Sequence, residues 1–170
     1  MNGFLAGVSD YFWNDYFLRK TEDCMDFIGL NYYFRRGIKL NWLKKEEKPK
    51  EKIISDLGWE IYPEGIYQVL KDASFLKKPI YITENGLADA DDKNRKKFIK
   101  DHLKWVHKAI EEGVDVRGYM HWSLMDNLEW DKGFWPRFGL VEIDYDTMAR
   151  IPRPSAFYYA DICKKNKLEI

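Results

Sequence analysis

The chain has 170 residues, a length that suits one domain with its own hydrophobic core. Basic and acidic residues number 28 each, so the overall charge favours neither a nucleic acid nor an acidic membrane as a partner. No run approaches the ~18 apolar residues of a membrane span and no signal peptide is evident, so we expect a cytoplasmic protein.

The first half of the chain predicts two helices and one strand. An aromatic-rich helix is expected from about residue 4 to residue 20, and a first strand at residues 26–33. Residues 44–52 mix lysine, glutamate and proline, which indicates a solvated loop. A second helix is expected to begin near Tyr62, because the proline that follows is tolerated in a first helical turn.

The second half predicts two strands and two helices, at residues 80–83, 94–112, 116–122 and 154–165. The apolar face of the longer helix is expected at Ile99, Leu103, Val106 and Ile110. Strands that alternate with helices indicate a parallel sheet. A complete (β/α)8 barrel typically needs ~250 residues, so the sequence predicts an α/β fold that is a segment of a barrel or a small open sheet.

One short β-branched strand carries a carboxylate to a glycine turn. Glu84 follows this strand directly and precedes Asn85-Gly86, so it lies at the C-terminal end, where α/β folds place their chemistry. Strict alternation predicts that Ile80 and Ile82 share the inward face with Glu84.

The ends of the other two strands carry aromatic residues. Tyr33 shares a face with Asn31, and Trp122 shares one with Met120, so Tyr33, Glu84 and Trp122 are expected around one pocket. A tyrosine hydroxyl beside a carboxylate orients it, as a nucleophile requires.

Four segments together resemble glycoside hydrolase family 1, the β-glucosidase family: residues 27–33, 82–86, 122–130 and 133–140. They occur in the family's order and span nearly the whole chain. The resemblance implies a partial (β/α)8 TIM barrel, roughly its last three βα units, with residues 1–170 as a single C-terminal portion. It implies a retaining hydrolase acting on terminal β-D-glycosides, with no metal ion and no cofactor.

The resemblance also implies individual roles. Glu84 matches the nucleophile that forms the glycosyl-enzyme, Tyr33 matches the tyrosine hydrogen-bonded to it, and Asn31 belongs to the same motif. Trp122 matches the platform under the sugar. Substrate contacts are further implied for Glu129, Trp130 and Phe138.

These contacts make chemical sense, because carboxylates accept strong hydrogen bonds from paired hydroxyls and aromatic faces cover the C–H side of a sugar ring. Aromatic residues make up 16% of the chain, which suits such a site as well as a large aromatic core. A carboxylate at position 129 also argues against a phosphosugar substrate, which it would repel.

The chain departs from the family in one essential respect. Retaining glycosidases use two carboxyl groups, and the family takes its acid/base from an Asn-Glu-Pro motif. No Glu-Pro dipeptide occurs in these 170 residues. Four interpretations follow: the C-terminal portion of a β-glucosidase-like enzyme, which we favour; one half of a split enzyme with a separate N-terminal half-barrel; a sugar-binding module; or a homo-oligomer formed through open sheet edges.

The remaining polar residues are assigned structural roles. His102 and His107 have the wrong spacing for a shared metal site, and His121 is expected to be a core residue with satisfied hydrogen bonds. Cys24 and Cys163 are expected to be free and buried. The acidic group at Asp89, Asp91 and Asp92 is expected to be a solvated loop leading to a helix N-terminus.

Overall fold

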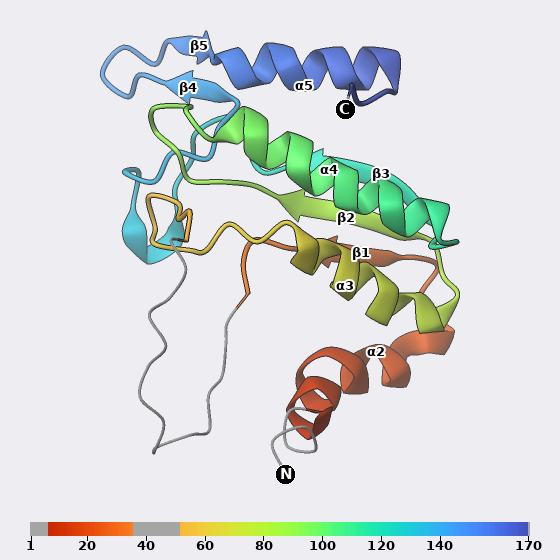
Figure 1. The fold of residues 1–170 in the computed structure, drawn as a ribbon. Coiled ribbons are helices and arrows are strands. Elements are labelled where there is room, and N and C mark those ends of the chain that lie inside the picture. Colours follow the sequence, from red (N-terminus) through yellow and green to blue (C-terminus); the bar gives the residue numbers. More distant parts are fainter. Residues whose placement is uncertain (1–6, 36–51, 170) are drawn as a thin grey trace.

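The computed structural model describes residues 7–35 and 52–169, in which a three-stranded parallel sheet is covered on one face by helices (Figure 1). The strands β1 (Ile28–Asn31), β2 (Ile80–Asn85) and β3 (Val116–His121) lie in chain order. Helix α3 (Glu64–Ala73) connects β1 to β2, and α4 (Arg95–Glu111) connects β2 to β3. Consecutive parallel strands with a crossover helix after each are the repeating unit of a (β/α)8 barrel.

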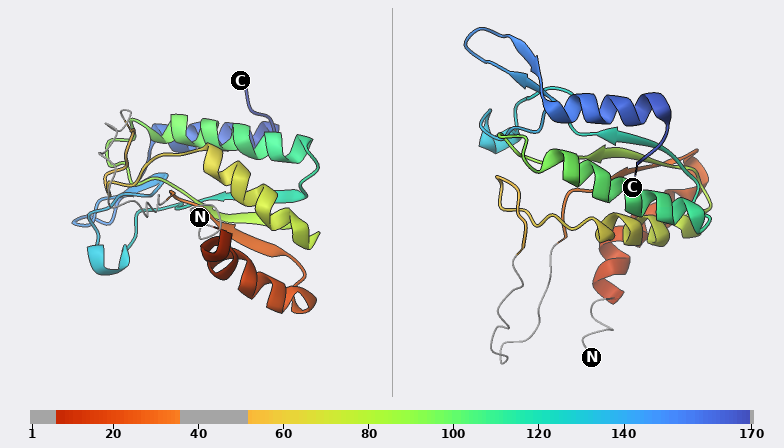
Figure 2. Two further views of the ribbon diagram at one scale, coloured as in Figure 1. Left: turned by 60° about the horizontal axis from the view of Figure 1, so that its bottom comes forward. Right: turned by 45° about the horizontal axis from the view of Figure 1, so that its top comes forward.

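Apolar residues on one face of the sheet form the main core with α3 and α4. Ile80 and Ile82 of β2 are almost completely buried there, against Ile66 and Leu70 of α3 and Val106 of α4. The left view of Figure 2 shows α3 and α4 together on this side of the strands. Within the described part of the chain, no helix covers the opposite face, where Phe27 and Met120 are about half exposed.

The prediction that Ile80 and Ile82 share a face with Glu84 is wrong, because β2 contains a bulge. Between Ile82 and Asn85 the strand advances three residues while β3 advances two, from Tyr119 to His121. The extra residue shifts the alternation, so Ile82 and Asn85 both face the helices. Thr83 and Glu84 therefore both project from the other side, and Glu84 reaches the open end of the sheet.

Most predicted elements are confirmed, with shifted ends. The first helix covers residues 7–21 of the described chain and comprises a π-helical turn η1 (Tyr11–Asp15) and α2 (Tyr16–Thr21), followed by η2 (Glu22–Cys24). The first strand is shorter than expected, and α5 (Pro154–Lys165) has its predicted bounds. Residues 4–6 and 44–51 of the predictions lie outside the described residues.

The sequence patterns missed three short elements after the third strand. These are a one-turn helix, η4 (Trp130–Lys132), and the antiparallel pair β4 (Val141–Ile143) and β5 (Arg150–Pro152). Three-residue strands are too short to show a period-two pattern, so periodicity had little to detect. A further short helix, η3 (Ser74–Leu76), follows α3 directly.

The buried face of α4 is rotated relative to the prediction. Ile99 and Val106 are buried as expected, but Ile110 is largely exposed, and Phe98 and His102 lie in the core instead. The reason is that α4 also packs against α5, through a second cluster that includes Phe98 and Ile99. A helix between two neighbours buries a broader arc than one apolar stripe.

Two further expectations are corrected. Cys24 and Cys163 are free but exposed, because the helix ends that carry them lie at the surface. His121 is buried as expected, but neither ring nitrogen has a hydrogen-bond partner among the described residues. None of the described helices is long and apolar enough to span a bilayer.

The loop before α4 is built around a buried arginine and is only partly solvated. Arg95 is completely buried and donates hydrogen bonds to the carbonyl oxygens of Asp89 (2.7 Å) and Arg137 (2.8 Å). It also pairs with Asp92, whose other carboxylate oxygen accepts the Ser155 N–H at 2.9 Å. Asp92 thus joins the start of α4 to the start of α5, Asp89 accepts the backbone N–H groups of Asn94 and Arg95 at the start of α4, and Asp91 is exposed.

Candidate active site

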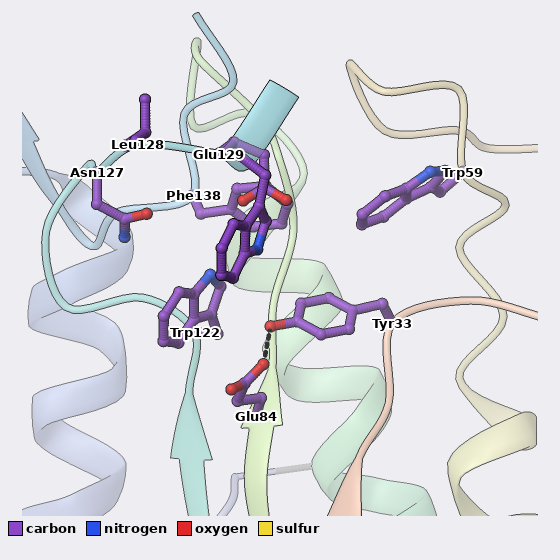
Figure 3. A pocket seen from close by; sticks show the side chains of 9 residues that line it. Tyr33, Trp59, Glu84, Trp122, Asn127, Leu128, Glu129 and Phe138 are labelled. Atoms are coloured by element: carbon purple, nitrogen blue, oxygen red, sulfur yellow. Dashed lines mark hydrogen bonds between the residues drawn. The ribbon is translucent and has the colours of Figure 1, made fainter. Parts of the chain in front are cut away.

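A cavity of about 290 Å³ opens at the C-terminal ends of the three strands (Figure 3). Six of the seven residues predicted for the site line it: Tyr33, Glu84, Trp122, Glu129, Trp130 and Phe138. They come from β1, β2, β3 and the segment after β3. Because parallel strands end at the same edge of a sheet, residues far apart in the sequence meet here.

The side chains of Tyr33 and Glu84 make a short hydrogen bond inside the cavity. The Tyr33 hydroxyl donates a hydrogen bond of 2.6 Å to Glu84 Oε2 (Figure 3). Burial, together with the adjacent Glu84 carboxylate, raises the pKa of Tyr33 well above its usual value. Tyr33 therefore remains a hydrogen-bond donor at any ordinary pH. It engages one oxygen of the Glu84 carboxylate, and the other oxygen has no hydrogen bond from a described residue.

Aromatic rings hold Tyr33 in place. Its ring meets those of Trp59 and Phe138 edge-on, at centroid separations of 5.9 and 6.1 Å. Trp59 also packs on Phe34, with centroids 4.8 Å apart, so the tyrosine lies against a continuous aromatic wall. Such edge-to-face contacts leave the ring few alternative orientations and fix the direction of its hydroxyl.

The segment after β3 supplies the second carboxylate of the pocket. Glu129 lies just before η4, and its N–H donates to the Gly133 carbonyl at 2.7 Å. Partial burial and the negative charges of Asp131 and Glu84 raise the pKa of Glu129. Trp130 adopts a positive φ of 45° and is 86% exposed, so its indole is presented at the rim.

Asn31 is the one predicted site residue that does not line the cavity. Its Oδ1 accepts a hydrogen bond of 2.7 Å from the Thr83 hydroxyl, lower on the same face of the sheet. Conversely, three lining residues, Trp59, Asn127 and Leu128, were not predicted. Asn127 and Leu128 lie inside a segment already singled out, whereas Trp59 lies in a loop whose fold brings it across from β1.

This arrangement combines features that suit a neutral, hydroxyl-rich ring. Two carboxylates face a space bounded by several aromatic side chains, with one carboxylate oriented by a tyrosine. Within the described part of the chain, no group of three or more His, Cys, Asp or Glu side chains is placed to hold a metal ion. The lining side chains offer carboxylates that can accept hydrogen bonds and aromatic faces that can cover apolar surface.

Comparison with known proteins gives consistent results. The model of Glycosyl hydrolase family 1 matches residues 13–168. The chain is 42% identical over 160 residues to a β-galactosidase of Sulfolobus acidocaldarius, covering 84% of this chain and 32% of that protein. It is 39% identical over 170 residues to β-glucosidase A of Thermotoga maritima, covering 89% and 37%.

Solved structures agree on the fold. A β-glycosidase from Pyrococcus horikoshii superimposes with a TM-score of 0.78 at 48% identity, over 85% of this chain and 36% of that one. The chain thus spans roughly a third of the length of the proteins it matches. Its three βα units are a segment of their barrel, as predicted.

Proposed function

This chain belongs to glycosyl hydrolase family 1, and we propose that its pocket is the nucleophile side of a retaining β-D-glycosidase site. The observation that carries the proposal is the 2.6 Å hydrogen bond from Tyr33 to Glu84 inside an aromatic-lined cavity. A carboxylate nucleophile must be oriented, with one oxygen free to attack, and this contact leaves the second oxygen of Glu84 without a hydrogen bond from a described residue.

The proposed reaction begins with attack of Glu84 on the anomeric carbon of a bound β-glycoside. A bond forms between a Glu84 oxygen and that carbon while the bond from the carbon to the leaving oxygen breaks. The leaving oxygen must take up a proton unless it belongs to a good leaving group. Water then hydrolyses the glycosyl ester and restores the carboxylate.

The other lining residues are proposed to hold the sugar. The Trp122 ring would lie under the C–H face of the pyranose, and Phe138 would close an apolar side. Glu129 would accept hydrogen bonds from two neighbouring hydroxyls, and Trp130 would donate its indole N–H to another. Asn31 is the weakest member of this set, because its amide oxygen is already engaged with Thr83.

The second carboxylate of a retaining mechanism has to come from outside this sequence. The two carboxyl groups lie about 5–5.5 Å apart in retaining enzymes, and the chain has no Asn-Glu-Pro motif. We therefore propose that residues 1–170 act as the C-terminal portion of a β-glycosidase barrel. The sheet face that carries Phe27 and Met120 supports a partner that completes the barrel, as do the outer edges of β1 and β3, which pair with no further strand among residues 7–35 and 52–169.

The proposed substrate class is β-D-glycosides in general. The matched relatives carry the names of both β-glucosidases and β-galactosidases. The configuration at a single hydroxyl is read by groups on all sides of the sugar, and this chain supplies one side. Glycone preference is thus expected to depend on the partner that completes the pocket.

The decisive test is covalent labelling of the purified chain by a 2-deoxy-2-fluoro-β-glycoside with a dinitrophenolate leaving group. Such a leaving group departs as an anion, so labelling needs the nucleophile but no acid catalyst. We expect one adduct per chain, which peptide mapping places on Glu84, and none in the Glu84→Gln variant or with the α-anomer.

Four outcomes would contradict the proposal. An adduct on Glu129 would reassign the nucleophile. No adduct on a chain shown to be folded would mean that this pocket does not act by itself. Sugar binding without labelling would favour a binding module, and a symmetric dimer that blocks the pocket would favour a structural assembly.

A further inference from the structure

Asn85 follows Glu84 in the sequence but lies on the other side of the sheet. Its side chain is completely buried, and its Nδ2 donates a hydrogen bond of 2.7 Å to the carbonyl oxygen of Tyr32, the residue directly after β1. Its Oδ1 accepts one of 2.7 Å from the Tyr119 hydroxyl on β3. One amide group therefore bridges both neighbours of the strand that carries the carboxylate.

The chemistry of the partners fixes the orientation of this amide. A carbonyl oxygen only accepts, so Nδ2 must face Tyr32 and Oδ1 must face Tyr119. Burial raises the pKa of Tyr119 well above its usual value, so its hydroxyl remains a donor. Both polar atoms of the Asn85 side chain are thus satisfied, which is what keeps an amide stable in an apolar core.

Backbone hydrogen bonds continue the connection to the pocket residues. The Tyr32 N–H donates to the Glu84 carbonyl at 2.9 Å, and the Trp122 N–H donates to the Asn85 carbonyl at 3.0 Å. Next to them, a Cβ atom on Gly86 would lie 1.7 Å from the Trp122 carbonyl oxygen, so only glycine fits there. Tyr33, Glu84 and Trp122 are each in this network or one residue from it.

The bulge in β2 makes this network necessary. An extra residue between Ile82 and Asn85 interrupts the regular ladder on both sides, as the register shifts toward β1 and β3 show. A bulge re-aims side chains but leaves ladder groups that need other partners. Asn85 supplies one of those partners, for the Tyr32 carbonyl, with its side chain.

We propose that Asn85 and Tyr119 are positioning residues that hold the bulge, and with it the Glu84 carboxylate, in the orientation needed for attack. They touch no substrate and act through the backbone of β2. This inference rests on the proposed role of Glu84 as nucleophile. According to this inference, residues on the helix-facing side of the sheet, away from the cavity, control the orientation of the Glu84 carboxylate.

The test separates the attack step from sugar binding. Labelling by the 2-fluoro-β-glycoside yields a dissociation constant for the reversible complex and a first-order constant for attack. We expect Tyr119→Phe to lower the first-order constant roughly 10- to 100-fold, the scale of a displacement of about 1 Å, while the dissociation constant changes little. Equal constants in variant and wild type would overturn the proposal.

Tyr159→Phe is the matched control. Its hydroxyl donates to the Tyr119 carbonyl at 2.8 Å, so this variant loses one hydrogen bond to the same strand without touching Asn85. We expect it to label at the wild-type rate. If both variants lowered the first-order labelling constant equally, the effect of Tyr119→Phe would come from a general loss of stability, and the proposal would also be overturned.

A measurement on the unmodified chain keeps the inference testable even if no labelling occurs. The side-chain amide protons of Asn85 should exchange with solvent far more slowly than those of exposed Asn166. In Tyr119→Phe, but not Tyr159→Phe, the side-chain carbonyl 13C resonance of Glu84 should shift. If the protein is not labelled but shows slow exchange at Asn85 and the Glu84 shift, the role of Glu84 as nucleophile is refuted and the positioning network stands. Fast exchange of the Asn85 amide protons would refute the network.

Discussion

Asp126 and Arg153 form a bidentate ion pair inside the protein. Arg153 Nη1 lies 3.1 Å from Asp126 Oδ1, and Nη2 lies 3.0 Å from Oδ2. Asp126 also accepts the Gly139 N–H at 2.8 Å, and Arg153 directly precedes α5. The pair therefore ties the segment that carries Glu129 to the last helix of the fold.

Replacing Asp126 with Asn should destabilise the protein strongly. The side chains of Asp126 and Arg153 are 0% and 5% exposed, so the substitution removes the buried counter-charge of the guanidinium and leaves it only the half-exposed Glu142 carboxylate at 3.6 Å. Removing one partner of a buried pair typically costs ~3–5 kcal/mol. Denaturant unfolding monitored by tryptophan fluorescence should show this loss. Asp131→Asn, the same change at an exposed pair with Lys132, is the control and should unfold like the wild type.

Glu84→Gln should abolish covalent labelling and leave the fold unchanged. The amide keeps the size of the side chain and can still accept the Tyr33 hydrogen bond, but it is not a nucleophile. Thermal unfolding should stay within a few degrees of the wild type, while labelling falls below detection. Labelling of this variant at the wild-type rate would remove Glu84 from the mechanism.

Glu129→Gln should weaken sugar binding and spare the protein's stability. Partial burial and the charges of Asp131 and Glu84 raise the pKa of Glu129, which means that its ionised form is disfavoured in the folded state. The unfolded chain loses this proton at lower pH, so the free energy of unfolding falls as pH rises through the raised pKa. The neutral amide avoids that cost.

Sugar binding should show the opposite dependence. An ionised Glu129 accepts stronger hydrogen bonds from hydroxyls than an amide does, so wild-type affinity should drop as pH falls through the raised pKa. Titration of a monosaccharide across this range, by calorimetry or NMR, should reveal the drop. Glu129→Gln should bind weakly with no such pH dependence; a pH-independent wild type would contradict the assignment.

The order of elements and the meeting of Tyr33, Glu84 and Trp122 could be predicted from the sequence. Both depend on local signals, namely periodicity and the rule that parallel strands end at one edge. The side of the sheet on which Ile80 and Ile82 lie could not be predicted. Alternation assumes an unbroken strand, and no residue in β2 signals the bulge.

Tertiary relationships account for the other differences. Trp59 enters the aromatic wall only because the loop before α3 folds back toward β1 and places its ring beside those of Tyr33 and Phe138. Arg95 is buried because three carbonyl oxygens, one of them from distant Arg137, and the Asp92 carboxylate surround its guanidinium group. Such partners come from segments that only the folded chain brings together.

Acid should destabilise this protein through its buried histidines. Burial lowers the pKa of His102 to about 4 and that of His121, which also lies near Arg95, to about 3. In the unfolded chain both titrate near the ordinary value of ~6.5. Between these values the unfolded state binds more protons, so the free energy of unfolding should fall as pH drops from about 6.5 toward 4.

His121→Phe should flatten this dependence. The ring keeps its aromatic neighbours Phe98 and Tyr159, and no hydrogen bond to a described residue is lost because neither ring nitrogen has such a partner. One fewer proton taken up on unfolding reduces the slope by up to ~1.4 kcal/mol per pH unit. Urea unfolding at pH 7, 6 and 5 measures this slope, the change in the free energy of unfolding per pH unit. Identical slopes for His121→Phe and the wild type would show that His121 is already protonated in the folded protein.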